Sequence, residues 1–146
     1  MAVVHKGLYE RWLTELWNGD VGRLEVVADE LVTPDFVGHW PGRPNLVRGP
    51  AALAEIVRVG RRPFDPLTFT VDVGPLSEGD LVAARWVGHG RYAGGDNALP
   101  GATAPRGTPV EFHGHDLLRL ENGRVAEYWV ISTETDLMAQ LTAPPG

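Results

Sequence analysis

The sequence predicts a single α+β domain in which helices pack on one curved sheet. In the first third of the chain, apolar residues recur at helical spacing. From residue 67 onward they alternate with polar residues, as they do in half-buried strands. A length of 146 residues, 43% of them hydrophobic, is enough for one core and too short for two, so we expect one domain spanning residues 1–146.

Three helices are expected before the first long strand. The first carries the regularly spaced apolar residues of segment 8–17. The second, over residues 24–31, must end near Thr33, because proline follows and disfavours a helical residue before it. The third begins at residues 49–50, a Gly-Pro pair, since proline is tolerated in the first helical turn.

The remainder of the chain predicts a run of antiparallel strands and a short final helix. Residues 67–73 and 81–92 read as two strands, and residues 111–130 read as a hairpin that turns at Asn122-Gly123. Segment 136–141 reads as the final helix. Before the hairpin, the Gly- and Pro-rich stretch Leu99 to Gly107 has no apolar alternation to anchor it, so we expect a mobile lid.

The composition excludes several classes of function. A formal net charge of −6 gives no basic surface for nucleic acid or for an anionic membrane. The absence of cysteine excludes disulfides, thiolate metal sites and a cysteine nucleophile. The N-terminal segment has no signal-peptide pattern and no apolar run is long enough to span a bilayer, so a cytoplasmic location is expected.

Asp116 is the most unusual residue of the predicted hairpin. Side chains alternate across a strand, so Asp116 shares a face with Phe112 and Leu118, where a carboxylate interrupts an apolar row. Burial raises the pKa of a carboxylate, which makes it a better proton acceptor near neutral pH. The alternative interpretation is structural: Asp116 bonds a backbone donor or an arginine such as Arg85.

A two-residue turn at Asn122-Gly123 predicts which residues accompany Asp116. In that register Asp116 lies opposite Trp129, and Glu127 lies diagonal to it on the same face. Glu127 has a structural alternative, an ion pair with Arg119 or Arg85. The expected pocket has apolar walls around a few polar groups. Its proposed substrate-binding residues are Trp40, Trp86, Phe112, Leu118, Glu127 and Trp129.

At these residues the chain resembles a known family. The run G-H-D-L-L-R-L-E-N-G-R-V-A-E-Y-W at 114–129, followed by Gln140-Leu141, is similar to the SnoaL-like polyketide cyclases of the nuclear-transport-factor-2-like superfamily. P-D-F-V-G-H at 34–39 and R-W at 85–86 agree with it. The resemblance implies a cone-shaped curved antiparallel sheet packed against three N-terminal helices, with an internal apolar pocket.

The resemblance also implies roles for individual residues. Asp116 matches the catalytic aspartate, the acid/base of an intramolecular aldol ring closure, and His39 matches a pocket histidine. Tyr92 stands where the family commonly has a histidine, and Thr133 stands where an aspartate often occurs. Tyr92 is therefore considered as a donor to a substrate carbonyl, or else as a buried phenol with a structural partner.

The function predicted from the sequence is a cofactor-independent cyclase that closes a ring on a small apolar polyketide intermediate. Closure proceeds by acid/base aldol chemistry or by a cycloaddition that depends on the shape of the pocket. The alternatives are an epoxide hydrolase or epoxide-opening cyclase, of whose acid-base set Asp116 and Arg85 form a fragment, and a non-catalytic ligand-binding dimer. No metal site is expected, because H-x-H at 113–115 lacks further ligands. We expect a homodimer built on the outer sheet face.

Overall fold

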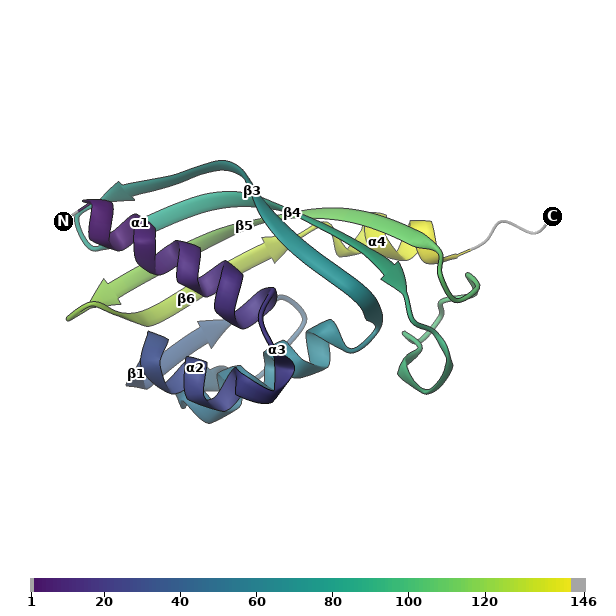
Figure 1. Ribbon diagram of the computed structural model, residues 1–146, viewed down its shortest axis with the longest axis horizontal. Coiled ribbons are helices and arrows are strands. Elements are labelled where there is room, and N and C mark those ends of the chain that lie inside the picture. The colour runs from purple at the N-terminus through teal and green to yellow at the C-terminus, as the bar shows by residue number, and fades with distance from the viewer. Residues whose placement is uncertain (1, 143–146) are drawn as a thin grey trace.

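The molecule consists of helices packed on one six-stranded sheet (Figure 1). The structure is a computed structural model that describes residues 2–142, so both extreme ends of the predicted domain lie outside the described residues. The helices are α1 (Ala2–Arg11), α2 (Leu24–Leu31), α3 (Gly49–Arg61) and α4 (Glu134–Leu141). The strands are β1 (Val32–His39), β2 (Val47–Arg48), β3 (Phe64–Glu78), β4 (Leu81–Tyr92), β5 (Pro109–Glu121) and β6 (Arg124–Ser132).

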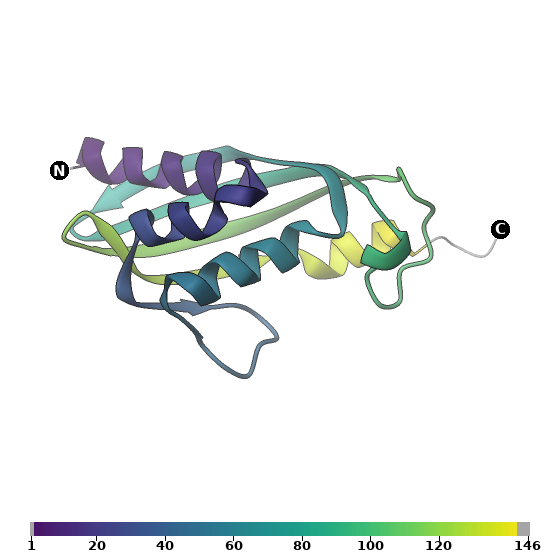
Figure 2. The same ribbon diagram turned by 60° about the horizontal axis from the view of Figure 1, so that its bottom comes forward.

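The strand order in the sheet is β2-β1-β6-β5-β4-β3. All neighbouring strands are antiparallel except β1 and β6, which run parallel and come from opposite ends of the chain. The predicted α+β fold with a curved sheet is therefore confirmed, with one parallel pairing that makes the sheet mixed. Helices α1, α2 and α3 all lie on one side of the sheet (Figure 2).

The N-terminal helices form because their apolar residues share one side. In α2, Leu24, Val27, Ala28 and Leu31 are all buried, which is the i, i+3, i+4, i+7 stripe of an amphipathic helix. After α1 the chain continues as a π-helical turn, Trp12–Trp17. Within the described residues no helix is both long and apolar enough to cross a membrane.

The β5–β6 hairpin turns at the predicted residues but changes register beyond the turn. Asn122 and Gly123 adopt positive φ angles of 52° and 77°, which suit a tight hairpin turn. Leu120 lies opposite Val125, as predicted, but the next pair joins Arg119 to Glu127. The extra residue in β6 is a β-bulge, and it reverses the faces of all later β6 residues. Asp116 consequently lies opposite Val130, so the predicted pairing with Trp129 was wrong.

The segment from Leu99 to Gly107 is tied to the rest of the molecule. The backbone N–H groups of Thr103 and Ala104 both donate to the carbonyl of Leu141, at 2.8 Å each. The Leu99 N–H donates to the Tyr92 hydroxyl at 2.9 Å, and Leu99, Ala102 and Ala104 pack against the core. These hydrogen bonds and apolar contacts anchor the segment, although its sequence has no apolar alternation; its role as a lid stays a prediction.

Candidate active site

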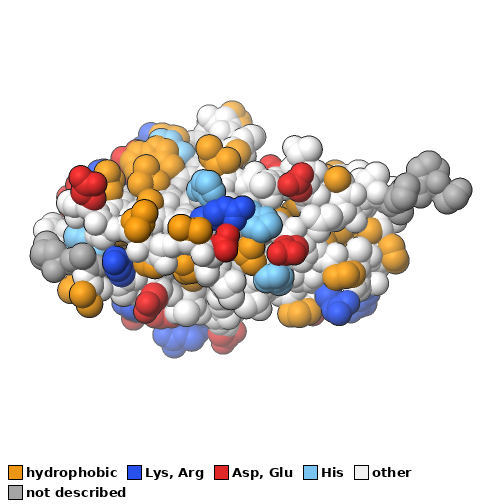
Figure 3. Space-filling view, turned by 90° about the horizontal axis from the view of Figure 1, so that it is seen from above, with side chains coloured by type: hydrophobic (Ala, Val, Ile, Leu, Met, Phe, Trp, Pro, Cys, Tyr) orange, Lys and Arg blue, Asp and Glu red, His pale blue; other side chains and the backbone are white. Residues whose placement is uncertain are grey.

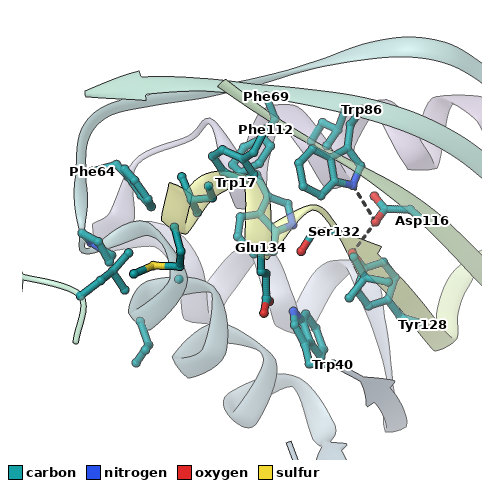
Figure 4. Close-up of a pocket in the computed structure, with 18 residues that line it drawn as sticks. Trp17, Trp40, Phe64, Phe69, Trp86, Phe112, Asp116, Tyr128, Ser132 and Glu134 are labelled. Atoms are coloured by element: carbon teal, nitrogen blue, oxygen red, sulfur yellow. Dashed lines mark hydrogen bonds between the residues drawn. The ribbon is translucent and has the colours of Figure 1, made fainter. Parts of the chain in front are cut away.

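A mostly apolar cavity of about 380 Å³ lies between the sheet and the helices (Figure 4). Its size is in the range of small-molecule sites. Every layer of the fold contributes to it: the π-helical turn, α3, α4 and four of the strands. The lining residues are Leu13, Trp17, Trp40, Val59, Gly60, Pro63, Phe64, Phe69, Trp86, Leu99, Phe112, Asp116, Tyr128, Val130, Ser132, Glu134, Leu137 and Met138.

Asp116 reaches this cavity from the inner face of β5. Strand alternation turns Gly114, Asp116 and Leu118 toward the helices, and all three are buried. Asp116 is 3% exposed and is the one buried charged side chain among the described residues. A buried carboxylate needs hydrogen-bond donors, because it has lost those of water.

Three neutral side chains supply those donors. The Tyr128 hydroxyl donates to Asp116 Oδ1 at 2.5 Å, and the Trp86 indole N–H donates to the same oxygen at 3.0 Å (Figure 4). The Tyr9 hydroxyl, from α1, donates to Oδ2 at 2.9 Å. Arg85 lies instead on the outer face of β4 and donates to Asp72 at 2.5 Å, so the predicted contact between Arg85 and Asp116 was wrong.

The environment of Asp116 places its ionisation near neutral pH. Burial raises the pKa of the carboxyl group to about 6, while the hydrogen bonds from Tyr128, Tyr9 and Trp86 act in the opposite direction. Burial, followed by the charge of Asp116, raises the pKa of the Tyr9 hydroxyl above its ordinary value. The same causes, in the same order, raise the pKa of the Tyr128 hydroxyl. Both phenols therefore stay protonated at neutral pH and serve as donors to Asp116.

Two of the predicted pocket residues, Trp40 and Trp86, each pack against a glycine that leaves room for the indole ring. Trp86 covers Gly114, where an added Cβ would lie 2.0 Å from the indole ring. Trp40 covers Gly38, where an added Cβ would lie 2.3 Å from its ring. Trp40 and Trp86 line the cavity together with Phe112, as predicted, whereas Leu118 is fully buried in the core outside the lining.

Three other candidates lie on the outer face of the sheet: the bulge turns Glu127 and Trp129 outward, and His39 ends the neighbouring strand β1. His39 Nε2 lies 2.7 Å from Glu127 Oε2, and the His39 ring stacks on Trp129 with centroids 5.3 Å apart. Arg119 also contacts Glu127, at 3.4 Å. The hydrogen bond from His39 holds the pKa of Glu127 below its ordinary value. The placement of His39, Glu127 and Trp129 in the pocket is therefore corrected: none of them lines the cavity.

Tyr92 is also outside the cavity lining. Its side chain is 2% exposed, and its hydroxyl oxygen accepts the hydrogen bond from the Leu99 N–H. This agrees with the alternative interpretation of Tyr92 as a buried phenol with a structural partner, here the Leu99 N–H. The hydrogen bond between Tyr92 and Leu99 anchors the start of the Leu99 to Gly107 segment.

Several residues of the site, three of them in the cavity lining, were missed by the sequence analysis. The predicted register put Glu127 and Trp129 on the Asp116 face, so Tyr128 was not considered, because the bulge is not visible in the hairpin turn. Tyr9 could have been found from its spacing to Trp12 and Leu16 on one helical side, although nothing local indicates that its hydroxyl meets a carboxylate. Ser132 and Glu134 lie at the end of β6 and the start of α4, where a strand pattern gives no signal.

The outer-face histidines do not assemble a metal centre within the described part of the chain. No group of three or more histidine, aspartate or glutamate side chains there is arranged to hold a metal ion. His113 lies 3.9 Å from Glu111. His113 and Glu111 therefore form a polar contact on the outer surface of the sheet.

Comparisons with known proteins agree with this fold. A candidate SnoaL-like polyketide cyclase from Jannaschia sp. CCS1 superposes with a TM-score of 0.83 at 23% identity, covering 99% of this chain and 95% of that one. IdmH, a candidate polyketide cyclase from Streptomyces antibioticus, gives 0.77 at 26% identity, covering 94% and 97%. AclR, a candidate hydroxylase from Streptomyces galilaeus, gives 0.79 at 23%, covering 99% and 100%.

The comparison with curated proteins gives no match. The family model of the SnoaL-like polyketide cyclases, by contrast, matches residues 8–141, nearly the whole chain. The chain belongs to the SnoaL-like polyketide cyclase family.

Proposed function

We propose that the protein is a cofactor-independent cyclase that closes a ring on a polyketide-type intermediate, with Asp116 as the acid/base. The observation that carries the proposal is a buried carboxylate in an aromatic-walled cavity, with a pKa raised by burial to about 6. Membership of the cyclase family and the likeness to IdmH support it.

Aldol closure needs one group that can take a proton and return it. The ionised Asp116 accepts a proton from a carbon between two carbonyl groups, and the resulting enolate attacks a second carbonyl of the same chain. A carbon–carbon bond forms, and the new alkoxide recovers the proton from Asp116. A carboxyl group whose pKa lies near neutral pH serves both steps, because it is neither fully protonated nor too weak a base.

The cavity walls perform a second task. Trp40, Trp86 and Phe112 hold an apolar chain in a folded conformation, which brings its reacting atoms together. A cyclisation that depends only on this orientation is the second candidate function, and the aromatic lining favours it. The two candidates differ in their dependence on the carboxylate.

Asp116→Asn separates these candidates, since it keeps the shape of the side chain and removes its charge. The assay follows ring closure of aromatic poly-β-ketone esters by chromatography and absorbance. Acid/base catalysis predicts a fall in turnover of roughly a hundredfold to ten-thousandfold. Unchanged turnover in a folded Asp116→Asn protein would support shape-driven closure, and tight ligand binding without turnover in either protein would indicate a non-catalytic binding module.

We also propose that the protein forms a homodimer through the outer sheet face. The side chains of Val73, Leu76 and Ile131 on this face are 55%, 65% and 74% exposed, beside His115 and Arg119. Figure 3 shows a surface on which hydrophobic side chains surround histidine, arginine and acidic ones. Exposed apolar area of this kind is typical of an interaction surface. Light scattering should give twice the monomer mass, and Ile131→Glu should shift it to the monomer; a monomeric wild-type protein at micromolar concentration would contradict the proposal.

A further inference from the structure

The two oxygens of the Asp116 carboxylate have different surroundings. Oδ1 accepts hydrogen bonds from Tyr128 and Trp86, whereas Oδ2 accepts one from Tyr9. A carboxylate oxygen offers about two acceptor sites. The described side chains therefore saturate Oδ1 and leave one site at Oδ2.

Two of the three donors to Asp116 line the cavity, and the third does not. Tyr128 and Trp86 line it together with Asp116, but Tyr9 does not. Tyr9 reaches the carboxylate from α1, so Oδ2 is held on the side of that helix. A substrate in the cavity thus finds Oδ1 already fully engaged, with the Tyr128 hydroxyl beside it.

The Tyr128 oxygen itself is an available acceptor. Its proton is donated to Asp116, and a hydroxyl oxygen keeps two lone pairs that can accept hydrogen bonds. The Trp12 ring packs against the Tyr128 ring with centroids 4.7 Å apart, and the buried Trp12 indole N–H forms no hydrogen bond of full geometry with any described group. It still acts as a weak donor toward Tyr128, which lowers the pKa of that hydroxyl against the larger rise from burial and from Asp116. A partial negative charge on the Tyr128 oxygen therefore has a donor nearby.

We propose that Tyr128 is a second catalytic residue, which takes the substrate proton and relays it to Asp116. The substrate proton moves to the Tyr128 oxygen while the Tyr128 hydroxyl proton moves to Asp116 Oδ1. The substrate becomes an enolate, Asp116 becomes neutral and Tyr128 regains its original form. The separation of 2.5 Å between Tyr128 and Oδ1 suits this second transfer. The inference rests on the proposed acid/base function of Asp116.

Tyr128→Phe and Tyr9→Phe form a matched pair for a test. Each removes one phenol hydroxyl that donates to Asp116, but from opposite oxygens, and only Tyr128 lines the cavity. The probe is 5-nitrobenzisoxazole. When a base removes its C–H proton, the N–O bond breaks and a coloured cyanophenolate forms, so proton abstraction is measured without knowledge of the natural substrate.

The relay predicts that Tyr128→Phe and Asp116→Asn slow the probe reaction by similar factors, roughly a hundredfold or more. Tyr9→Phe should remain within roughly tenfold of the wild-type rate, with its pH profile displaced, because one stabilising donor of the carboxylate is lost. If Tyr128→Phe behaves like Tyr9→Phe, the proton passes directly to Oδ2 and the relay is wrong. If Asp116→Asn reacts as fast as the wild type, the acid/base function itself is wrong.

A second measurement uses the wild-type protein and does not depend on how the variants fold. The C–H proton of the probe does not exchange with solvent, but the Tyr128 hydroxyl proton does. A relay therefore predicts a slower reaction in D₂O on the plateau of the pH profile. Equal rates in H₂O and D₂O would show that no exchangeable proton moves, which overturns the relay even if Asp116 proves essential.

Discussion

Arg119 lies opposite Glu127 across the β5–β6 hairpin, and this single pairing decides which side chains of β6 face the cavity. Because Leu120 still lies opposite Val125, one residue of β6 is left over between the two pairs. From that point Tyr128 faces inward toward Asp116, and Trp129 faces outward toward His39. The bulge therefore exchanges the indole expected at the carboxylate for a hydrogen-bonding phenol.

Trp40→Ala and Trp129→Ala should separate the two faces of the sheet. Trp40 lines the cavity and packs against Tyr128 with ring centroids 4.9 Å apart, whereas Trp129 stacks on His39 outside it. Loss of a cavity-lining indole removes apolar contact worth about 2 kcal/mol, so binding of 2-naphthol should weaken by roughly tenfold or more in Trp40→Ala. Calorimetric titration should give nearly unchanged affinity for Trp129→Ala. Equal losses would contradict the assignment of faces.

Asp116→Asn should change how stability depends on pH. The folded-state pKa is raised from 3.8 to about 6, so the folded protein binds the proton more tightly than the unfolded chain does. The contribution of Asp116 to stability is then fully present below the unfolded pKa and is lost as the pH rises through about 6. Each tenfold change in proton affinity is about 1.4 kcal/mol, so the loss is on the order of 3 kcal/mol.

Denaturant unfolding of the wild type and of Asp116→Asn across this pH range tests whether the contribution of Asp116 to stability falls as the pH rises. The difference in unfolding free energy between wild type and Asp116→Asn should move in favour of Asn as the pH rises from about 4 to about 7. All other titrating groups are common to the two proteins and cancel. A constant difference across the range would mean that burial does not raise the pKa of Asp116.

Gly114→Ala should disturb the site, and Gly7→Ala should not. A Cβ at Gly114 would lie 2.0 Å from the Trp86 ring, so the indole must move and its hydrogen bond to Asp116 is strained or lost. Overpacking of this kind costs roughly 1–3 kcal/mol. Gly7 lies in α1 with no atom within 4 Å of an added Cβ, so alanine there should raise stability by about 0.5–1 kcal/mol. Thermal unfolding of the pair measures both effects, and a neutral Gly114→Ala would show that Trp86 is free to shift.

The fold was predictable because its local signals agree with one another. The apolar stripe of α2, the strand alternation of β4 and the Asn122-Gly123 turn each specify an element without reference to the others. Asp116 was found for the same reason, since a carboxylate in an apolar row is visible in the sequence alone. These features depend on residues that are close in the chain.

The partners of Asp116 were not predictable in this way. Tyr9 lies 107 residues from Asp116, and the two meet only because α1 packs across the sheet. The orientation of Tyr128 depends on a bulge, and both Val125 and Ala126 are buried where alternation would expose one of them. Two consecutive buried side chains near a hairpin turn are a signal of a bulge, but Ala126 is small enough to be read as neutral.

Tyr92→Phe tests whether the segment from Leu99 to Gly107 acts as a lid. The substitution removes the oxygen that accepts the Leu99 N–H and leaves the aromatic ring in place. Loss of one such hydrogen bond should lower the unfolding free energy by about 1 kcal/mol.

Because Leu99 lines the cavity, a loosened Leu99 should also raise the dissociation rate of bound 2-naphthol by several-fold, measured by stopped-flow fluorescence of the cavity tryptophans. Thr108→Val is the control, since its hydroxyl donates to the Pro105 carbonyl at the far end of the segment. A stability loss without any change in the dissociation rate would show that the segment is a fixed part of the wall.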